Sequence, residues 1–574
     1  MKYKLKNAIN STDIVEQVCN NRGVDFKRIE EFLYPKKWVR SNPKIYTNLE
    51  LIADTIIFVA KAKKKIGILI DSDCDGFLSA AMIVNYLREV LGVEEIRFYM
   101  HENKEHGLTS FIMNQIKEEP PELLIIPDAS SNDWCQQAEL SHMGIATVIL
   151  DHHEAKGYSP FALIANNQLQ EGVNKNLSAG GMVMKLLEMI DEKLNLNRAL
   201  DYCDLAAVSL VGDCMLMNNV ETRFYVQYGI MNINNPLLLE LIRVEGERSY
   251  ESISFDIAPA INAFIRIGEV TEKQELFLAL IGDNRKKEIS IRGQGKFILP
   301  LPEYISKMAT RIKARQTTAV KKAIESKNAK LISNLPFTVF ILDDETKKTL
   351  TGLIGNKLVD MYKKPAIVIR LLENGETYGG SGRTTDTFPN FKDYLRDIKF
   401  FNFCEGHQGA FGVNIDKESL EDMLVKLNDE SLDGYEDCYL VDKVYENFVS
   451  AYDIMQISEL NRYWSRGFDK PLFYIKLTDL ESAKVEVIGQ KRNTIRIKHN
   501  NITYLKFKCE PSEIEKIEQT NITEIEMVGF FNVNEYYDNL YPQVFIEDIE
   551  YKGTKKLNNS FFSFNFNNFN DVKW

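Results

Sequence analysis

The sequence predicts an α/β protein made of a parallel-sheet domain, a connecting helix, a smaller α/β domain and a C-terminal all-β region. Three observations carry this prediction. Between residues 65 and 300, short apolar runs alternate with helical segments, which is typical of a parallel sheet. The alternation returns over residues 333–440. Over residues 470–555, short alternating runs are separated by turns, as in a small barrel.

Residues 1–64 are expected to form a helical lead-in, because apolar residues recur at helical spacing in LELIADTIIFVAKAKKK. The parallel-sheet domain follows, and from about residue 178 to 290 its pattern becomes mostly helical. Acids and histidines stand at the C-terminal ends of its strands, where open α/β sheets bind ligands. The predicted strands lie in IGILIDSD (66–73), IRFYM (96–100), LLIIPDAS (123–130) and TVILDHH (147–153).

Residues 301–332 are expected to connect the two α/β domains, with 303–330 forming one long basic helix. This helix has eight Lys or Arg residues against Glu303 and Glu325, a net charge of +6. A helix of this charge either lines a nucleic-acid path or is a solvated linker, and the sequence leaves both open.

The second α/β domain, residues 333–440, contains two strand-like runs, FTVFIL and PAIVIRLL, before the Gly-rich stretch YGGSGRT (378–384). We expect this stretch to be a turn that offers backbone N–H groups. Residues 441–469 are expected to be a linker to the barrel. Residues 556–574 are rich in Asn and Phe and are expected to be a disordered tail.

The composition indicates a globular intracellular protein, with 44% hydrophobic and 26% charged residues. The net charge of −12 argues against a protein that coats duplex DNA by charge alone. Eight scattered cysteines without a CxxC pair fit reduced thiols better than a disulfide framework. No stretch approaches the ~18 apolar residues that a membrane span needs, so we expect a cytoplasmic location and no membrane partner.

Three acids follow the first predicted strand. Asp71, Asp73 and Asp75 lie in LIDSDCDGF, with Gly76 allowing a sharp turn into the next helix. Period-2 spacing points the three carboxylates to one side while the strand lasts. Like charges this close repel strongly, so the spacing indicates a bound cation.

Further acids and imidazoles follow other apolar runs. Asp128 ends LLIIPD, Asp151, His152 and His153 end the next strand, and Asp213 follows LAAVSLVG. Carboxylates mixed with imidazoles and without thiolates suit Mn²⁺ or Mg²⁺ better than structural zinc. Each group alone could be an acidic turn, a helix cap or a core histidine. Four of them at strand ends or helix starts of one domain favour a shared metal site.

These residues resemble a known family. DSDCDG, PDAS, LDHHE and VGDC are similar to the four motifs of the DHH phosphoesterase superfamily, and within it to the RecJ family of single-strand-specific 5′→3′ DNA exonucleases. GGSGRT and CEGHQGAFG are similar to motifs of the associated DHHA1 domain, and the stretch ending VFIEDIEY to the RecJ OB-fold. Other RecJ-like stretches are NRGVDFKRIEEFLYP, EHGL, LSAGGMVMKLL, IAPAINAFIRIGE and TGLIGNKLVDMYKKPAIVI.

The resemblance implies roles for the acids and histidines. Two metal ions, Mn²⁺ or Mg²⁺, would be held by Asp73, Asp75, Asp128, His152 and Asp213, with Asp128 as the bridging carboxylate. His153 would contact the phosphate, and Asp151 would hold a histidine by hydrogen bonding. Some superfamily members carry a metal-binding histidine where this chain has Leu69, so Asp71 becomes the candidate to complete the first metal's shell.

The resemblance also implies substrate contacts. Asn262 and Arg266 would contact phosphate, and Ser381, Arg383 and His407 would bind the 5′ end of the strand. In the barrel, bases and aromatics alternate, which suits either single-strand binding or a solvated face. These barrel residues are Lys491, Arg492, Arg496, Lys498, Tyr504 and Phe507.

The sequence thus predicts a two-metal 5′→3′ exonuclease that hydrolyses single-stranded DNA to 5′-mononucleotides. Its partners would be single-stranded DNA and a single-strand-binding or replication protein. Two other functions stay open. One is a DHH phosphodiesterase acting on short oligoribonucleotides or cyclic dinucleotides, and the other is a replication scaffold that has lost its metals.

Overall fold

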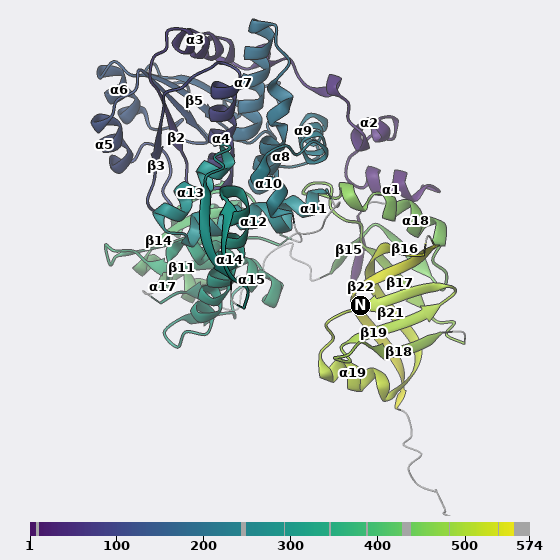
Figure 1. Cartoon of the computed structure of the whole chain (residues 1–574). Helices are drawn as coiled ribbons and strands as arrows, with labels where there is room; N and C mark the ends of the chain where they lie inside the picture. Colours follow the sequence, from purple (N-terminus) through teal and green to yellow (C-terminus); the bar gives the residue numbers. More distant parts are fainter. Residues whose placement is uncertain are drawn as a thin grey trace, which may run out of the picture. The chain divides into compact units, whose positions relative to one another are not determined.

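The computed structural model describes residues 1–6, 11–242, 248–291, 293–343, 346–385, 388–427, 438–481, 483–537 and 539–555 (Figure 1). The chain divides into two compact units. The main unit comprises Glu30–Glu436 and Ser465–Phe468. The C-terminal unit comprises Met1–Ile29, Asp437–Trp464 and Asp469–Trp574. The predicted tail, residues 556–574, lies outside the described residues.

The main unit is built around a parallel sheet, as predicted, with Leu163–Asn166 as a fifth strand that the sequence did not indicate. Strands β2 and β4 are buried along their whole length, because helices cover both faces of the sheet. In spatial order the strands are β3 (Ile96–Met100), β2 (Ile66–Ile70), β4 (Leu123–Pro127), β5 (Ala146–Asp151) and β6 (Leu163–Asn166).

The period-2 alternation of the strands sends successive side chains to two different cores. Ile68 and Ile70 face one core, whereas Leu69 faces the other. The helices of the second core are α5 (Ser110–Glu118) and α6 (Trp134–His142). The helices of the first core include α3 (Leu49–Lys61), α4 (Cys74–Glu89), α7 (Ala179–Leu194), α8 (Cys203–Gly212), α12 (Ala258–Ile267) and α13 (Val270–Leu280).

Two features of the main unit differ from the expectation. The mostly helical stretch ends in an antiparallel hairpin, β7 (Lys286–Ile291) with β8 (Gly295–Pro300). The basic helix α14 spans Leu301–Ile324 and ends six residues before the predicted boundary, because Lys330–Ile332 forms strand β9 of the next sheet.

The smaller α/β domain has a six-stranded mixed sheet. Its order is β13 (Phe401–His407), β14 (Ala410–Asp416), β12 (Thr377–Arg383), β11 (Ala366–Leu371), β10 (Thr338–Ile341) and β9. The predicted Gly-rich turn is therefore wrong, since Tyr378–Arg383 of this stretch lie in β12, which pairs with β11 and β14. Its glycines permit close packing: a Cβ on Gly380 would lie 1.9 Å from the Val368 carbonyl oxygen.

The C-terminal unit has a seven-stranded sheet and gathers distant parts of the chain. β1 (Tyr3–Leu5) pairs with β15 (Tyr439–Val441), so the first residues belong here rather than to a helical lead-in. The expected linker 441–469 contains β16 (Lys443–Glu446) and α18 (Ala451–Glu459). The sheet order is β16, β17 (Phe473–Leu477), β21 (Thr520–Tyr536), β22 (Asn539–Lys555), β20 (Ile502–Lys506), β19 (Thr494–His499) and β18 (Lys484–Ile488). Among the described residues, no helix has both the length and the apolar character needed to cross a bilayer.

Candidate metal centre

The turn after β2 places Asp71 and Asp73 at the start of α4. Asp73 caps this helix, with its carboxylate accepting a hydrogen bond from the Gly76 N–H at 2.9 Å. Glycine is required at position 76, because a Cβ there would lie 2.7 Å from both the Cβ and the carbonyl oxygen of Asp71. The tight turn therefore holds the two carboxylates at the carboxyl edge of the sheet.

Asp75 is fixed by the N-terminus of α7. Its carboxylate accepts hydrogen bonds from the backbone N–H groups of Ala179 and Gly180, at 2.7 and 3.0 Å, and from the hydroxyls of Ser178 and Ser209. Backbone N–H groups at a helix N-terminus favour an anion. A Cβ on Gly180 would lie 2.0 Å from the Ser209 Oγ, so the glycine of LSAGG lets these groups converge.

Asp128 follows β4 in the left-handed region, with φ at 70°. This conformation is unfavourable for a residue with a side chain, and such strain is concentrated at functional sites. The side chain is 1% exposed, and neither carboxylate oxygen accepts a hydrogen bond from the described residues. Its Oδ1 lies 3.2 Å from the His152 Nε2. A buried carboxylate of this kind is suited to hold a cation.

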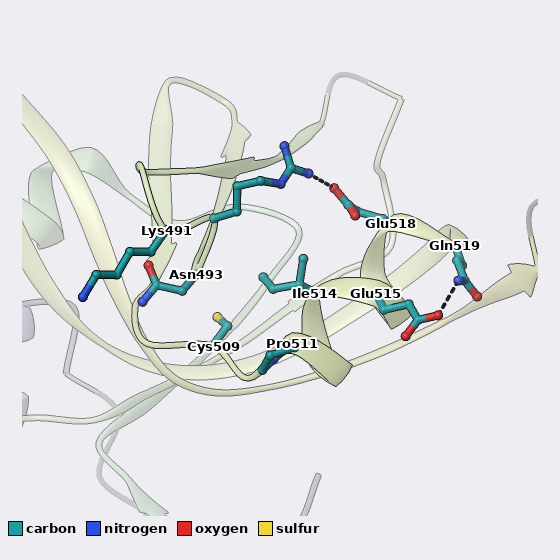
Figure 2. Close-up of a pocket in the computed structure, with 9 residues that line it drawn as sticks. Lys491, Asn493, Cys509, Pro511, Ile514, Glu515, Glu518 and Gln519 are labelled. Atoms are coloured by element: carbon teal, nitrogen blue, oxygen red, sulfur yellow. Dashed lines mark hydrogen bonds and ion pairs between the residues drawn. The ribbon is translucent and has the colours of Figure 1, made fainter.

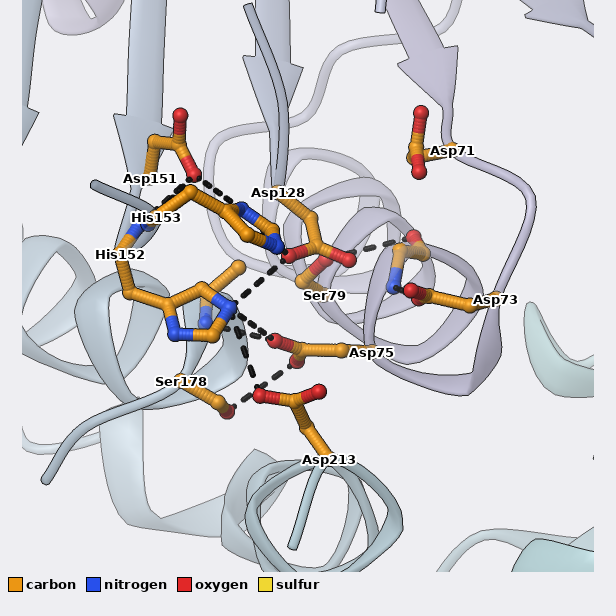
Figure 3. Close-up of polar contacts among 12 residues, drawn as sticks. Asp71, Asp73, Asp75, Ser79, Asp128, Asp151, His152, His153, Ser178 and Asp213 are labelled. Atoms are coloured by element: carbon orange, nitrogen blue, oxygen red, sulfur yellow. Dashed lines mark hydrogen bonds and ion pairs between the residues drawn. The ribbon is translucent and has the colours of Figure 1, made fainter. Parts of the chain in front are cut away.

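Asp213 reaches the same place from a helix rather than a strand. The run LAAVSLVG lies in the stretch expected to be mostly helical and forms part of α8. Asp213 ends this helix, so the expectation that it stands at a strand end or a helix start is wrong. The His152 Nε2 lies 3.5 Å from both the Asp213 Oδ2 and the Asp75 Oδ2. His152 therefore stands between Asp128 on one side and Asp75 and Asp213 on the other (Figure 3).

Three groups of side chains can each hold a metal ion, since their ligand atoms lie within 4.8 Å of one another. Figure 3 shows Asp128 in the middle of the acids and the two histidines. The donor set of carboxylates and imidazoles, together with the unsatisfied oxygens of Asp128, fits Mn²⁺ or Mg²⁺. The groups are Asp128 with His152 and His153, Asp75 with His152 and Asp213, and Asp71 with Asp73 and His106.

Asp151 holds His153 in place. Its Oδ1 lies 2.8 Å from the His153 Nδ1 and accepts the backbone N–H of His152 at 2.7 Å. Burial disfavours the charge on Asp151, but the hydrogen bond and the charge of His153 outweigh it and lower the pKa of Asp151. The same pairing outweighs desolvation of the imidazole and raises the pKa of His153 to about 10. His153 is thus a cationic donor beside Asp128.

Crowding of the acids shifts their pKa values in opposite directions. Burial, together with the charges of Asp213 and Asp73, raises the pKa of Asp75 to about 7. Burial and the charges of Asp73 and Asp75 raise the pKa of Asp128 well above its usual range. For Asp73, desolvation is outweighed by the charge of His106, by the neighbouring Asp128 carboxyl and by the Gly76 N–H, which lower its pKa to about 2. A bound cation would relieve this repulsion.

The sequence did not single out His106. It lies in the loop after β3, and its Nδ1 is 2.5 Å from the Asp71 Oδ2. The position of His106 in the sequence could have indicated it. EHGL follows a predicted strand, and the carboxyl end of that strand meets the same edge of the sheet.

The predicted phosphate residues Arg266 and Arg383 come together with Lys104. Desolvation and the charge of Arg266 lower the pKa of Arg383 to about 10. Desolvation and the charges of Arg266 and Arg383 also lower the pKa of Lys104. Asp73 is close enough to affect both Lys104 and Arg266 electrostatically. Cations gathered beside the acids indicate a place for a phosphate.

Arg383 lies across helix α15 (Thr351–Tyr362). A Cβ on Gly352 would be 2.2 Å from the Arg383 Nη2, so any side chain at this position would shift the guanidinium. Ser381, on the same strand, shares a hydrogen bond of 2.9 Å with the Thr351 hydroxyl. Asn262 is one helical turn from Arg266 on α12, and both are partly exposed. The side chain of His407 lies outside the described residues.

The barrel residues predicted to bind a single strand differ in whether they are ion-paired, exposed or buried. Arg492 pairs with Glu518 and Arg496 with Glu486, both at 2.5 Å. Lys491, Lys498 and Phe507 are exposed. Tyr504 is fully buried, so the expectation that it stacks on a base is wrong.

Lys491 and Arg492 line a pocket of about 330 Å³ beside helix α19 (Pro511–Glu518) (Figure 2). Pro511, Ile514, Glu515 and Glu518 of α19 also line the pocket, and Glu518 pairs with Arg492. This volume is at the lower end of the range for ligand pockets.

Comparison with known proteins agrees with this fold. The model of the DHH family, N-terminal domain, matches residues 65–210. The chain is 31% identical to the putative SPbeta prophage-derived single-strand DNA-specific exonuclease YorK of Bacillus subtilis strain 168, over 95% of this chain and 97% of that protein. It is 23% identical to the single-stranded-DNA-specific exonuclease RecJ of the same organism, over 95% of this chain and 69% of RecJ.

Solved structures show the same architecture. RecJ from Thermus thermophilus in complex with Mn²⁺ matches with a TM-score of 0.70 and 19% identity, over 95% of this chain and 76% of that one. The same protein in complex with Mg²⁺ matches with a TM-score of 0.67 and 18% identity, over 94% and 75%. The fold and the acids at its strand ends define a DHH-type phosphoesterase architecture. The chain belongs to the RecJ-like family of single-strand-specific exonucleases within the DHH superfamily.

Proposed function

We propose that the protein is a 5′→3′ exonuclease that hydrolyses single-stranded DNA to 5′-mononucleotides with two divalent ions, Mn²⁺ or Mg²⁺. The observation that carries this proposal is the sharing of residues between candidate metal groups. His152 belongs to two of them, and the unsatisfied carboxylate of Asp128 lies between His152 and Asp73. The names of the YorK and RecJ relatives and the Mn²⁺ and Mg²⁺ of the RecJ structures support it.

The ligands would be Asp71, Asp73, Asp75, Asp128, His152 and Asp213, with Asp128 bridging. Two bound ions supply an activated water and stabilise the charge of an in-line phosphodiester displacement. Asp75 keeps its orientation through the N-terminus of α7 and the two serines. His153, held by Asp151, donates a hydrogen bond to the scissile phosphate.

Arg266, Arg383 and Lys104 would hold the 5′-terminal phosphate. Their mutual repulsion, seen in the lowered pKa values of Lys104 and Arg383, falls when a dianion lies among them. Asn262, Ser381 and His407 would be further side-chain donors to the same phosphate. Because Arg266 lies near Asp73, a strand held by its 5′ end presents its first phosphodiester to the metals.

The C-terminal unit would hold the strand beyond the site of hydrolysis. Lys491 and Lys498 add charge, and the exposed ring of Phe507 can stack on a base.

The test is digestion of end-labelled single strands. With Mn²⁺, a 3′-labelled DNA oligonucleotide should shorten progressively while a 5′-labelled one releases its label at once as a mononucleotide, and a chelator should stop both reactions. A matched RNA oligonucleotide and a cyclic dinucleotide test the alternative function. A phosphodiesterase of short substrates would cleave one of these in preference to the DNA. Release of label from the 3′ end first would contradict the direction. A protein that binds neither ion nor cleaves any substrate would be a scaffold.

A further inference from the structure

His106 reaches the candidate metal centre from a strand next to the one that carries the acids. β3 pairs in parallel with β2, with Met100 opposite Ile70, so the loop after β3 emerges beside the turn of Asp71 and Asp73. In that loop, the Gly107 N–H donates to the Asp71 Oδ1 at 2.9 Å, and the His106 Nδ1 contacts the Asp71 Oδ2. The imidazole is about half exposed, at 53%, whereas Asp71 is fully buried.

Two independent observations indicate that this contact is part of an ion site. The ligand atoms of Asp71, Asp73 and His106 all lie within 4.8 Å of one another. Next to them, Asp128 is almost completely buried and has no hydrogen bond to the described residues from either oxygen. Figure 3 shows the Asp128 carboxylate between His152 on one side and Asp73 on the other. An ion between Asp128 and the Asp71–Asp73 pair would satisfy these oxygens.

We propose that His106 is an imidazole ligand of the metal ion held by Asp71, Asp73 and Asp128, a role that rests on the proposed two-metal function. The centre would then have one imidazole for each ion, His106 for the first and His152 for the second. Imidazole nitrogen favours first-row transition ions over Mg²⁺. His106 therefore makes the first position selective for Mn²⁺.

The competing role for His106 is to orient Asp71 by a hydrogen bond without touching the ion. The variant His106→Asn separates the two roles, because the asparagine side-chain nitrogen takes the place of the imidazole Nδ1. It keeps a donor for Asp71 but does not replace an imidazole as a metal ligand. His142→Asn is the matched control, since His142 is exposed on α6 and belongs to none of the candidate groups.

The experiment counts nitrogens on bound Mn²⁺ in the full-length protein by pulsed electron paramagnetic resonance. Wild type and His142→Asn should each show two imidazole couplings at two bound ions, and His106→Asn should show one. Titration calorimetry with Mn²⁺ and with Mg²⁺ should show a loss of affinity for Mn²⁺ at one site of His106→Asn. We expect the Mn²⁺ affinity of this site to fall at least about tenfold, since even residues that only hydrogen-bond to a metal ligand contribute roughly 10–100-fold to metal affinity. The Mg²⁺ affinity should fall less.

The outcomes are distinguishable. Two imidazole couplings in His106→Asn, or equal losses for Mn²⁺ and Mg²⁺, would overturn the inference while leaving the two-metal proposal intact. Failure of the wild-type protein to bind any Mn²⁺ would overturn the two-metal proposal itself. In His106→Asn, the second site, formed by Asp75, His152 and Asp213, should keep its imidazole coupling. This coupling shows that the variant is folded.

Discussion

Asp128 combines three unfavourable properties at one residue. Its backbone is left-handed, its carboxylate is buried, and it accepts no hydrogen bond from the described part of the chain. Burial and the surrounding acids raise its pKa well above the usual range. Residues that destabilise the protein without a ligand are typical of functional sites.

Replacing Asp128 with Asn should abolish hydrolysis and stabilise the metal-free protein. The amide keeps the shape of the carboxylate but cannot bridge two ions, whose stabilisation of the transition state amounts to several kcal/mol, so turnover should fall by more than about 100-fold. Thermal unfolding in a chelator should occur at a higher temperature than in wild type. Asp54→Asn, at an exposed ion pair with Lys193, is the control and should change neither quantity. A tenth of wild-type turnover in Asp128→Asn would contradict the bridging role.

The pKa of about 7 at Asp75 predicts how stability depends on pH. An aspartate in the unfolded chain has a pKa near 3.9, so between about pH 4 and pH 7 the folded metal-free protein holds a proton that the unfolded chain has released. The free energy of unfolding should therefore fall as pH rises through this range. Urea unfolding in a chelator at several pH values measures the slope.

Asp75→Asn provides the comparison, because the variant lacks this titration and should lose less stability over the same range. Added Mn²⁺ should remove the slope in wild type by stabilising the ionised carboxylate. Identical slopes for wild type and Asp75→Asn would show that other groups cause the dependence.

At the scale of elements, local patterns predict the strands well. All four predicted strands of the main sheet are present, since a short apolar run is a property of the segment itself. The expected position was wrong for Asp213, which stands at the end of a helix and not at a strand end or a helix start. The prediction also failed for β12, which was expected to be a turn. This glycine-rich segment pairs with a strand on each side, and its neighbours leave no room for larger side chains.

The N-terminus of α7 gives a prediction at this scale. Gly180→Ala should weaken metal binding and destabilise the protein, because its Cβ would displace the Ser209 hydroxyl, which donates a hydrogen bond to Asp75. Overpacking of this kind typically costs about 1–3 kcal/mol, which exceeds the helix propensity gained by alanine.

The neighbouring substitution Gly181→Ala is the matched control. A Cβ at Gly181 meets mainly the side chains of Leu177 and Leu210 and does not contact the Asp75 network. Urea unfolding and Mn²⁺ titration of both variants make the comparison. Equal metal affinity in the two would mean that Asp75 does not depend on the helix N-terminus.

At the scale of the whole molecule, the C-terminal unit cannot be removed by cutting the chain at residue 470. Met1–Ile29 and Asp437–Trp464 belong to the same unit, and β16 and α18 would lose β17 and β21, which they contact. The role of this unit in strand binding is better tested by substitutions on its surface.

The triple variant Lys491→Ala, Lys498→Ala, Phe507→Ala should bind long single strands at least about tenfold more weakly, because one stacked base contributes about 1–3 kcal/mol. Hydrolysis of a dinucleotide should be unchanged. The salt dependence of binding should also become shallower, since fewer phosphates are neutralised. Replacing the ion-paired Arg492 and Arg496 instead should have a smaller effect. Unchanged affinity and salt slope in the triple variant would indicate that this face serves another partner.

The sequence by itself indicated strands β2 to β5 of the main sheet and the acids that follow them, because both depend on patterns within a few residues; it indicated neither β6 nor the spatial order of the strands. It also supplied Arg266 and Arg383 through their motifs. Only the tertiary structure decided that these arginines lie beside each other and Lys104, that His106 meets Asp71, and that Tyr504 is buried. Such facts depend on the register between strands and on packing between segments far apart in the chain. β1 with β15 is the plainest case: three residues near the start pair with three beyond residue 438, and neither segment specifies its partner locally.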